Sequence, residues 1–140
     1  MKSAWWEHLA HPADVGVRGV AWSMEAAFEQ AALALTALTV DPASLVPCDA
    51  VEIRCQEPDE ELLLFAWLNA VILEMDTRHM AFGRFEVHLD AGRLNATAWG
   101  ERLDPRRHEL RVEAKAATCS QLQVGQRPDG LWVAQCIVDV

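Results

Sequence analysis

The sequence has 140 residues, a formal net charge of −9 and 51% hydrophobic residues. The length fits a single domain over residues 1–140 with a hydrophobic core of ordinary size. Stable nucleic-acid binding needs clustered lysine and arginine, so the acidic balance argues against direct binding and favours a basic protein partner or a metal ion. No apolar run approaches the roughly 20 residues that span a bilayer, so no membrane association is expected.

The cysteines form no Cys-x-x-Cys pair and lie far apart, at Cys48, Cys55, Cys119 and Cys136. A zinc site or a disulfide framework therefore has little support. We expect four reduced, mostly buried thiols in a cytoplasmic protein, with Cys119 and Cys136 as core residues on strands.

The first third of the chain predicts two strands and a helix. Residues 4–9 are expected to form a short strand and residues 15–20 a second one, in which Gly16 and Gly19 indicate a bulge or a close backbone approach. Ser23 is a favourable N-cap, and apolar residues recur at helical spacing as far as Leu38.

A second helix is predicted after a half-buried strand at residues 51–55. Acidic residues at 57–61, with Asp59 as a candidate cap, favour its start, and it extends through residues 62–75. This helix is apolar on nearly every side, so it should be buried. Asn69 is its one polar interior residue and is expected to satisfy a backbone group.

The rest of the chain predicts strands joined by turns. Asp90-Ala91-Gly92-Arg93 is typical of a hairpin turn, residues 104–107 form another turn, and residues 131–140 form the last strand. Two helices and about seven strands indicate an α+β fold, in which two α-helices pack on a predominantly antiparallel β-sheet.

The two chain ends carry the clearest candidate site. If they lie side by side, Asp14, Asp139 and the α-carboxylate of Val140 would form a set of hard oxygen anions, which suits Ca²⁺ or Mg²⁺. The alternative is that Asp14 opens a turn and Asp139 is a solvated chain end. Glu113 and Lys115 would share one face of a strand, either as a surface ion pair or with Lys115 neutralising the acidic set.

Several motifs together resemble the archease family, over about residues 7–140. They are His11-Pro12-Ala13-Asp14-Val15-Gly16, the helix at residues 23–32, Leu62-Leu63 with Trp67-Leu68-Asn69, Gly100-Glu101, Glu113-Ala114-Lys115-Ala116-Ala117-Thr118 and Ile137-Val138-Asp139-Val140. The family usually has threonine where this chain has Pro12, which affects the expected geometry around Asp14.

The resemblance implies an accessory protein rather than an enzyme. Archeases assist the GTP-dependent tRNA-splicing RNA ligase by accelerating its guanylylation and allowing many turnovers. By motif, the divalent metal site would use Asp14, Asp139 and Val140, while Lys115 with Glu113 would serve activation of the partner. Two other functions remain open from the residues: a metal-dependent phosphoester hydrolase and a chaperone-like module for RNA-processing proteins.

Overall fold

The computed structural model describes residues 2–140. Two helices and eight strands follow one another in a single domain, with a short 3-10 turn between the first helix and the third strand. Their bounds are β1 Ala4–Ala10, β2 Val15–Ala21, α1 Met24–Thr39, η1 Pro42–Ser44, β3 Asp49–Gln56, α2 Glu60–Arg78, β4 Met80–Asp90, β5 Arg93–Arg102, β6 Ala116–Ala117, β7 Gln123–Gln126 and β8 Trp132–Asp139.

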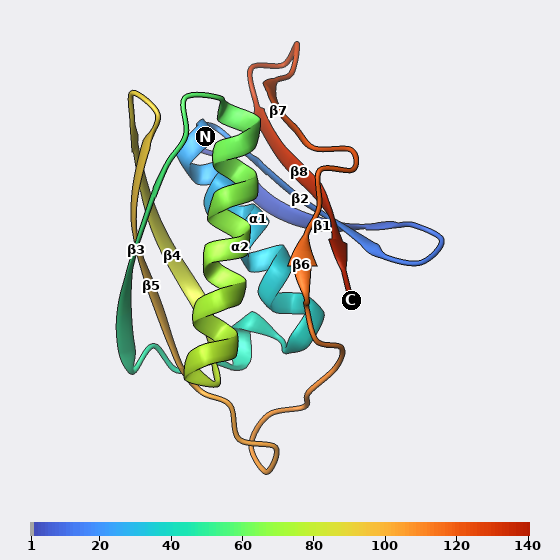
Figure 1. Cartoon of the computed structure of the whole chain (residues 1–140), viewed down its shortest axis with the longest axis vertical. Coiled ribbons are helices and arrows are strands. Elements are labelled where there is room, and N and C mark those ends of the chain that lie inside the picture. Colours follow the sequence, from blue (N-terminus) through green and yellow to red (C-terminus); the bar gives the residue numbers. More distant parts are fainter. Residues whose placement is uncertain (1) are drawn as a thin grey trace.

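The strands form two antiparallel sheets with both helices between them (Figure 1). One sheet has the order β1-β2-β8-β6, with β7 also paired to β8, and the other has the order β3-β5-β4. Helix α1 contacts β2 and β4, so it bridges the two sheets, and α2 contacts β3 on one side and β6 and β7 on the other. The α+β class is confirmed, but the strands are divided between two sheets instead of one.

The predicted caps and turns are present in the structure. Ser23 accepts a hydrogen bond from the backbone N–H of Ala26, and Asp59 accepts one from Leu62. These bonds satisfy amide groups that have no partner within the first turn of each helix. The predicted β4–β5 hairpin turn uses Ala91 and Gly92, both with positive φ, as a primed two-residue turn requires.

Gly19 allows α1 to lie directly against β2. A Cβ atom at this position would overlap the carbonyl oxygen of Ala27 and the amide nitrogen of Ala31, both in the helix backbone. The close approach predicted from the sequence is therefore real, and it sets the distance between the helix and the sheet that carries both chain ends.

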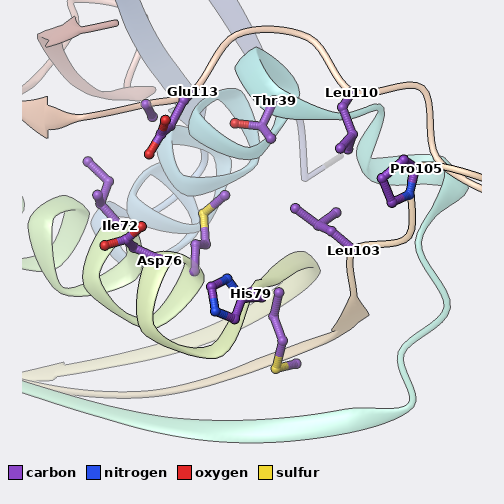
Figure 2. Close-up of a pocket in the computed structure, with 11 residues that line it drawn as sticks. Thr39, Ile72, Asp76, His79, Leu103, Pro105, Leu110 and Glu113 are labelled. Carbon is purple, nitrogen blue, oxygen red and sulfur yellow. The ribbon is translucent and has the colours of Figure 1, made fainter.

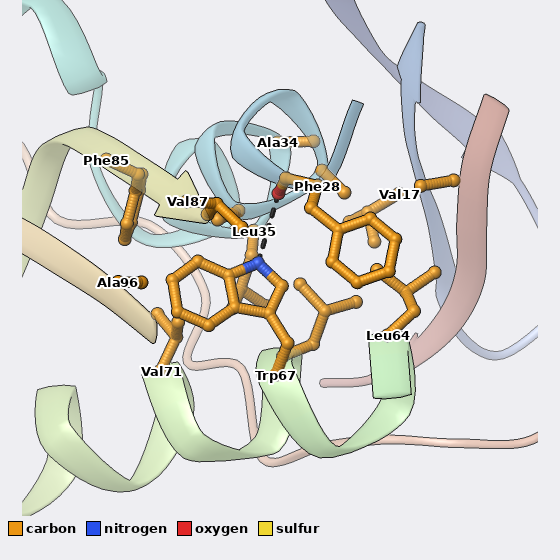
Figure 3. Close-up of a cluster of buried hydrophobic side chains, with 14 of the residues drawn as sticks. Val17, Phe28, Ala34, Leu35, Leu64, Trp67, Val71, Phe85, Val87 and Ala96 are labelled. Atoms are coloured by element: carbon orange, nitrogen blue, oxygen red, sulfur yellow. Dashed lines mark hydrogen bonds between the residues drawn. The ribbon is translucent and has the colours of Figure 1, made fainter. Parts of the chain in front are cut away.

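The core is centred on Trp67, which is fully buried (Figure 3). Its indole N–H donates to the carbonyl oxygen of Phe28 over 3.1 Å, so the bond ties α2 to α1. The ring of Phe85 meets the indole edge-on, at 5.7 Å between centroids, and adds the second sheet to the same cluster. One aromatic side chain thus joins both helices to β4.

Two carboxylates of α1 accept hydrogen bonds from the backbone of β4. Glu29 accepts from the N–H of Val87, and Glu25 accepts from that of Leu89. Because β4 is an edge of its sheet, these bonds satisfy amide groups that would otherwise be available to another chain. Burial raises the pKa of Glu29, since desolvation outweighs the bond from Val87.

The prediction of mostly buried cysteines was wrong. Cys48 and Cys119 are exposed, Cys55 is half-buried and only Cys136 lies in the core. Cys119 follows the short strand β6, at the point where the chain leaves its pairing with β8 and turns. All four thiols are free. Neither helix in residues 2–140 combines the length and the apolar character that would let it cross a bilayer.

Candidate functional site at the end of strand β8

Strand pairing brings the turn between β1 and β2, which carries Asp14, beside the C-terminal end of β8. In the antiparallel register of β2 and β8, Val15 lies opposite Val138. Asp14 and Asp139 are the next residues outward from this pair, on either strand. Asp14 and the C-terminal residues therefore lie side by side in the backbone, as the sequence suggested. The N-terminus itself lies at the other end of the sheet, because β1 runs antiparallel to β2.

Asp139 lies on the outer face of this sheet, away from the helices. Alternate residues of β8, including Cys136 and Val138, pack in the core between the sheets. Since side chains alternate along a strand, Asp139 belongs to the opposite face, and it is exposed. Val140 follows with its side chain against the core cluster.

Lys115 meets β8 at the same end. Its backbone N–H donates to the carbonyl oxygen of Asp139 over 2.8 Å. Asn69 of α2 holds the strand that follows Lys115, β6, because its side-chain oxygen accepts a hydrogen bond from the N–H of Ala117 over 2.9 Å. This is the backbone-satisfying role predicted for Asn69, and it ties β6 to the helix.

Glu113 and Lys115 do not lie on a strand, contrary to the prediction, because β6 begins only at Ala116. The preceding backbone is held elsewhere: the N–H groups of Arg111 and Val112 donate to the carbonyl oxygens of Thr39 and Leu38. These oxygens belong to the last turn of α1, where carbonyl groups lack partners within the helix. The segment thus completes a helix end instead of extending a sheet.

The two residues also form no ion pair with each other. Within residues 2–140, neither Glu113 nor Lys115 has an oppositely charged side chain within 4.0 Å. Both side chains are exposed, and both residues line a cavity against α2. The surface ion pair considered from the sequence is therefore absent, and both charges are available to a partner.

The buried carboxylate of Glu101 fixes the segment after β5 that leads to Glu113 and Lys115. Glu101, at the end of β5, accepts from the N–H of Val46 over 2.6 Å and from two nitrogens of Arg107 over 2.7 and 2.8 Å. His108 places its Nε2 atom 3.3 Å from the same carboxylate. The bond from Val46, with those from Arg107 and the nearby ring of His108, holds the pKa of Glu101 below its ordinary value.

A cavity of about 300 Å³ opens between α2 and segment 103–115 (Figure 2). Its walls are mostly apolar, and Asp76 and Glu113 come from facing elements. A second cavity of about 310 Å³ adjoins it and reaches Lys115. The two share four residues, which are Ile72, Asp76, Glu113 and Ala114.

Sequence reasoning missed the role of Asp76 and His79 in this cavity. Asp76 lies in the last turn of α2, and His79 caps that helix with a positive φ of 54°. A signal for Asp76 was present, because an acidic side chain is unfavourable near the negative end of a helix dipole. His79 lies just beyond the apolar stretch from which the helix was recognised.

The carboxylates near the end of β8 are chemically of the kind that binds hard divalent cations. Carboxylates are the preferred protein ligands of Ca²⁺ and Mg²⁺. The Nδ1 atom of His11 is buried without a hydrogen-bond partner and lies 4.0 Å from a carboxylate oxygen of Asp14, too far to occupy that oxygen by a hydrogen bond. Within residues 2–140, no three histidine, cysteine, aspartate or glutamate side chains form a metal-binding group by themselves.

The buried thiol does not provide a nucleophile. Burial raises the pKa of Cys136 to about 12, so it remains a thiol at neutral pH. Only the thiolate is a strong nucleophile, and this residue behaves as a small apolar core side chain.

Comparison with known proteins identifies the family. The model of the Archease protein family (MTH1598/TM1083) matches residues 6–140. "Protein archease" of Thermococcus gammatolerans is 37% identical over 96% of this chain and 98% of its own length, and that of Pyrococcus abyssi is 36% identical with the same coverage. The solution structure of Methanobacterium thermoautotrophicum protein 1598 superposes with a TM-score of 0.79 at 27% identity, over 96% of this chain and 98% of its own. The chain therefore belongs to the Archease family.

Proposed function

We propose that this chain is an accessory protein, not itself an enzyme, that activates a GTP-dependent RNA ligase of the tRNA-splicing type. Membership of the Archease family supports this role, because the sequence motifs that mark the family imply it. The accessory protein promotes guanylylation of the ligase and lets each ligase molecule complete many ligations.

The observation that carries the proposal is the convergence of the motif residues on one end of a sheet. Asp14 precedes β2, Asp139 ends β8, and Lys115 is bonded to Asp139 through the backbone. These residues come from three distant parts of the sequence, and Glu113 lines the adjoining cavity. A partner that wraps around this end of the molecule would meet all four residues.

In the proposed site, the carboxylates of Asp14, Asp139 and Val140 hold a divalent ion of the Ca²⁺ or Mg²⁺ type. Such an ion supplies concentrated positive charge and takes about six to eight oxygen ligands. Three carboxylates that each bind through one oxygen leave positions open for water, or for oxygen atoms of the partner. The exposed outer face of Asp139 makes such contacts sterically accessible.

The acidic balance of the chain suits an electrostatic approach to the partner. The active site of a ligase that binds GTP and RNA phosphates is expected to be cationic. A net charge of −9 would then speed and orient the encounter, as complementary charge does in other complexes.

The test is a ligation time course with the cognate ligase at substoichiometric concentration, with GTP and Mg²⁺. The wild-type chain should convert a single-turnover reaction into many turnovers, and Asp139→Ala should not. A variant extended by one alanine after Val140 should also fail, because the α-carboxylate is displaced while every side chain is kept. Isothermal titration with Ca²⁺ should show weaker binding by both variants.

Absence of stimulation by the wild-type chain would contradict the proposal. The purified chain should also be assayed alone on phosphate esters and RNA, where turnover would indicate a metal-dependent hydrolase instead. Protection of unrelated proteins from aggregation, unaffected by Asp14→Ala, would indicate a chaperone-like module.

A further inference from the structure

The two cavities between α2 and segment 103–115 lie next to each other, because they share four lining residues. We refer to them together as the groove. The first cavity has apolar walls from Met75, Met80, Leu103 and Leu110, and it is large enough for a bulky side chain (Figure 2). Leu110 is 42% exposed, so this wall lies open to a ligand from outside.

The two carboxylates that line the groove favour a positively charged ligand. Asp76 and Glu113 line both cavities from opposite walls, and neither makes an ion pair within residues 2–140. The neighbouring Arg78 does not neutralise Asp76, because it pairs with Glu74. Two free carboxylates beside an apolar chamber complement a cationic side chain that is close to an apolar one.

The position of Asp76 adds an energetic argument. It lies in the last turn of α2, where the helix dipole disfavours a negative charge, and it faces a second carboxylate. Within residues 2–140, no cationic side chain lies within 4.0 Å of either carboxylate, although Lys115 lines the second cavity with them. A basic group bound in the groove would offset both unfavourable interactions at once.

We propose that the groove binds a segment of a partner protein in which a large apolar side chain fills the first cavity and a nearby arginine or lysine pairs with Asp76 and Glu113. The far end of the groove reaches Lys115, whose backbone is bonded to Asp139. A segment bound along the groove therefore lies close to the end of β8. Only the identity of the partner rests on the proposed function; the recognition chemistry is independent of it.

The first test is an NMR titration of the full ¹⁵N-labelled chain with blocked five-residue peptides. The probe peptide has the order glycine, phenylalanine, glycine, arginine, glycine, because residues two apart in an extended chain point to the same side. Amide shifts should concentrate at Asp76, His79, Leu110 and Glu113. A peptide with glutamine in place of arginine should bind at least fivefold more weakly.

Matched variants test both parts of the groove. Asp76→Asn and Leu110→Ser should each weaken binding of the arginine peptide at least fivefold. Glu109→Gln and Val112→Ser make the same chemical changes at exposed positions of segment 103–115 that line neither cavity, and they should stay within twofold of wild type. Amide spectra of each variant verify that the fold is intact.

The proposal is overturned if neither peptide binds, if both bind equally, or if the control variants weaken binding as much as the groove variants. The ligation assay then separates this inference from the proposed function. Groove variants should raise the concentration of the chain that gives half-maximal stimulation, whereas Asp139→Ala should lower the plateau. If the wild-type chain does not stimulate the ligase at all, the proposed function fails and the peptide titration still decides the groove.

Discussion

The backbone N–H of Lys115 donates to the carbonyl oxygen of Asp139 over 2.8 Å, although the side chains of the two residues serve different faces of the molecule. Asp139 belongs to the outer face of the β2–β8 sheet, and Lys115 lines the groove against α2. The end of β8 is therefore a meeting point between a carboxylate site and a groove. A partner could contact both only by wrapping around this end.

Replacing Lys115 with alanine or with proline separates the backbone role from the side-chain role. Lys115→Ala keeps the N–H and should change the free energy of unfolding by less than about 0.5 kcal/mol, since the side chain is exposed. Lys115→Pro removes the N–H and should cost about 1 kcal/mol or more. Urea unfolding measures both. If alanine is as destabilising as proline, the side chain is structural, and a loss of ligase stimulation by Lys115→Ala would not identify it as functional.

Asn69 should control how firmly β6 is held. Asn69→Ala leaves the N–H of the buried Ala117 without its 2.9 Å acceptor, which should cost about 1–3 kcal/mol. Amide hydrogen exchange should be faster at Ala117 and at Lys115 than in the wild-type chain. Asn69→Asp keeps an acceptor oxygen and should retain most of the protection. Equal losses in both variants would contradict the assignment of this bond.

Local signals in the sequence were sufficient for much of the fold. Ser23 and Asp59 mark the starts of the helices because a cap involves only neighbouring residues. The hairpin after Asp90 is likewise encoded by the two residues of its turn. The division into two sheets was not predicted, because the pairing of β2 with β8 joins strands separated by most of the chain and no local pattern specifies it.

The same distinction applies to the candidate site: features set by neighbouring residues were predictable, and features set by contacts between distant segments were not. Asp14 and Asp139 were proposed from the chemistry of their carboxylates and then from the family motif, and their meeting at one end of a sheet follows from the strand register. The conformation at Glu113 was not predictable, because it depends on Arg111 and Val112 bonding to carbonyl oxygens at the end of α1. Asp76 and the buried Glu101 became recognisable only when their surroundings were known.

Because of Glu101, the free energy of unfolding should decrease as the pH falls below neutral. Its pKa in the folded chain lies below the ordinary value, first because of the bond from Val46 and then because of Arg107 and His108. A lowered carboxyl pKa contributes stability that is complete at pH 7, above the value in the unfolded chain, and that is lost as the pH falls through the folded value. The midpoint of urea unfolding should therefore decrease between about pH 5 and pH 3.

The control for this acid dependence is Glu101→Gln. Glutamine cannot ionise, so the decrease below pH 5 should become shallower, and the variant should be less stable than wild type at pH 7. Glu29 acts in the opposite direction, because its raised pKa favours the folded state as the pH falls. Removing this opposing contribution in Glu29→Gln should make the decrease steeper. An unchanged profile in Glu101→Gln would show that other groups govern acid unfolding.

Asp76→Asn should stabilise the isolated chain. The carboxylate lies at the negative end of the α2 dipole without an ion-pair partner in residues 2–140, so its neutralisation should raise the free energy of unfolding by about 0.3–1 kcal/mol at low salt. Glu60→Gln, at the positive end of the same helix, should have the opposite sign, and 1 M NaCl should diminish both effects. A destabilised Asp76→Asn would show that this carboxylate makes a favourable contact in the free chain. If Asp76→Asn is more stable than wild type and also binds the arginine peptide more weakly, then Asp76 destabilises the free chain and contributes to peptide binding.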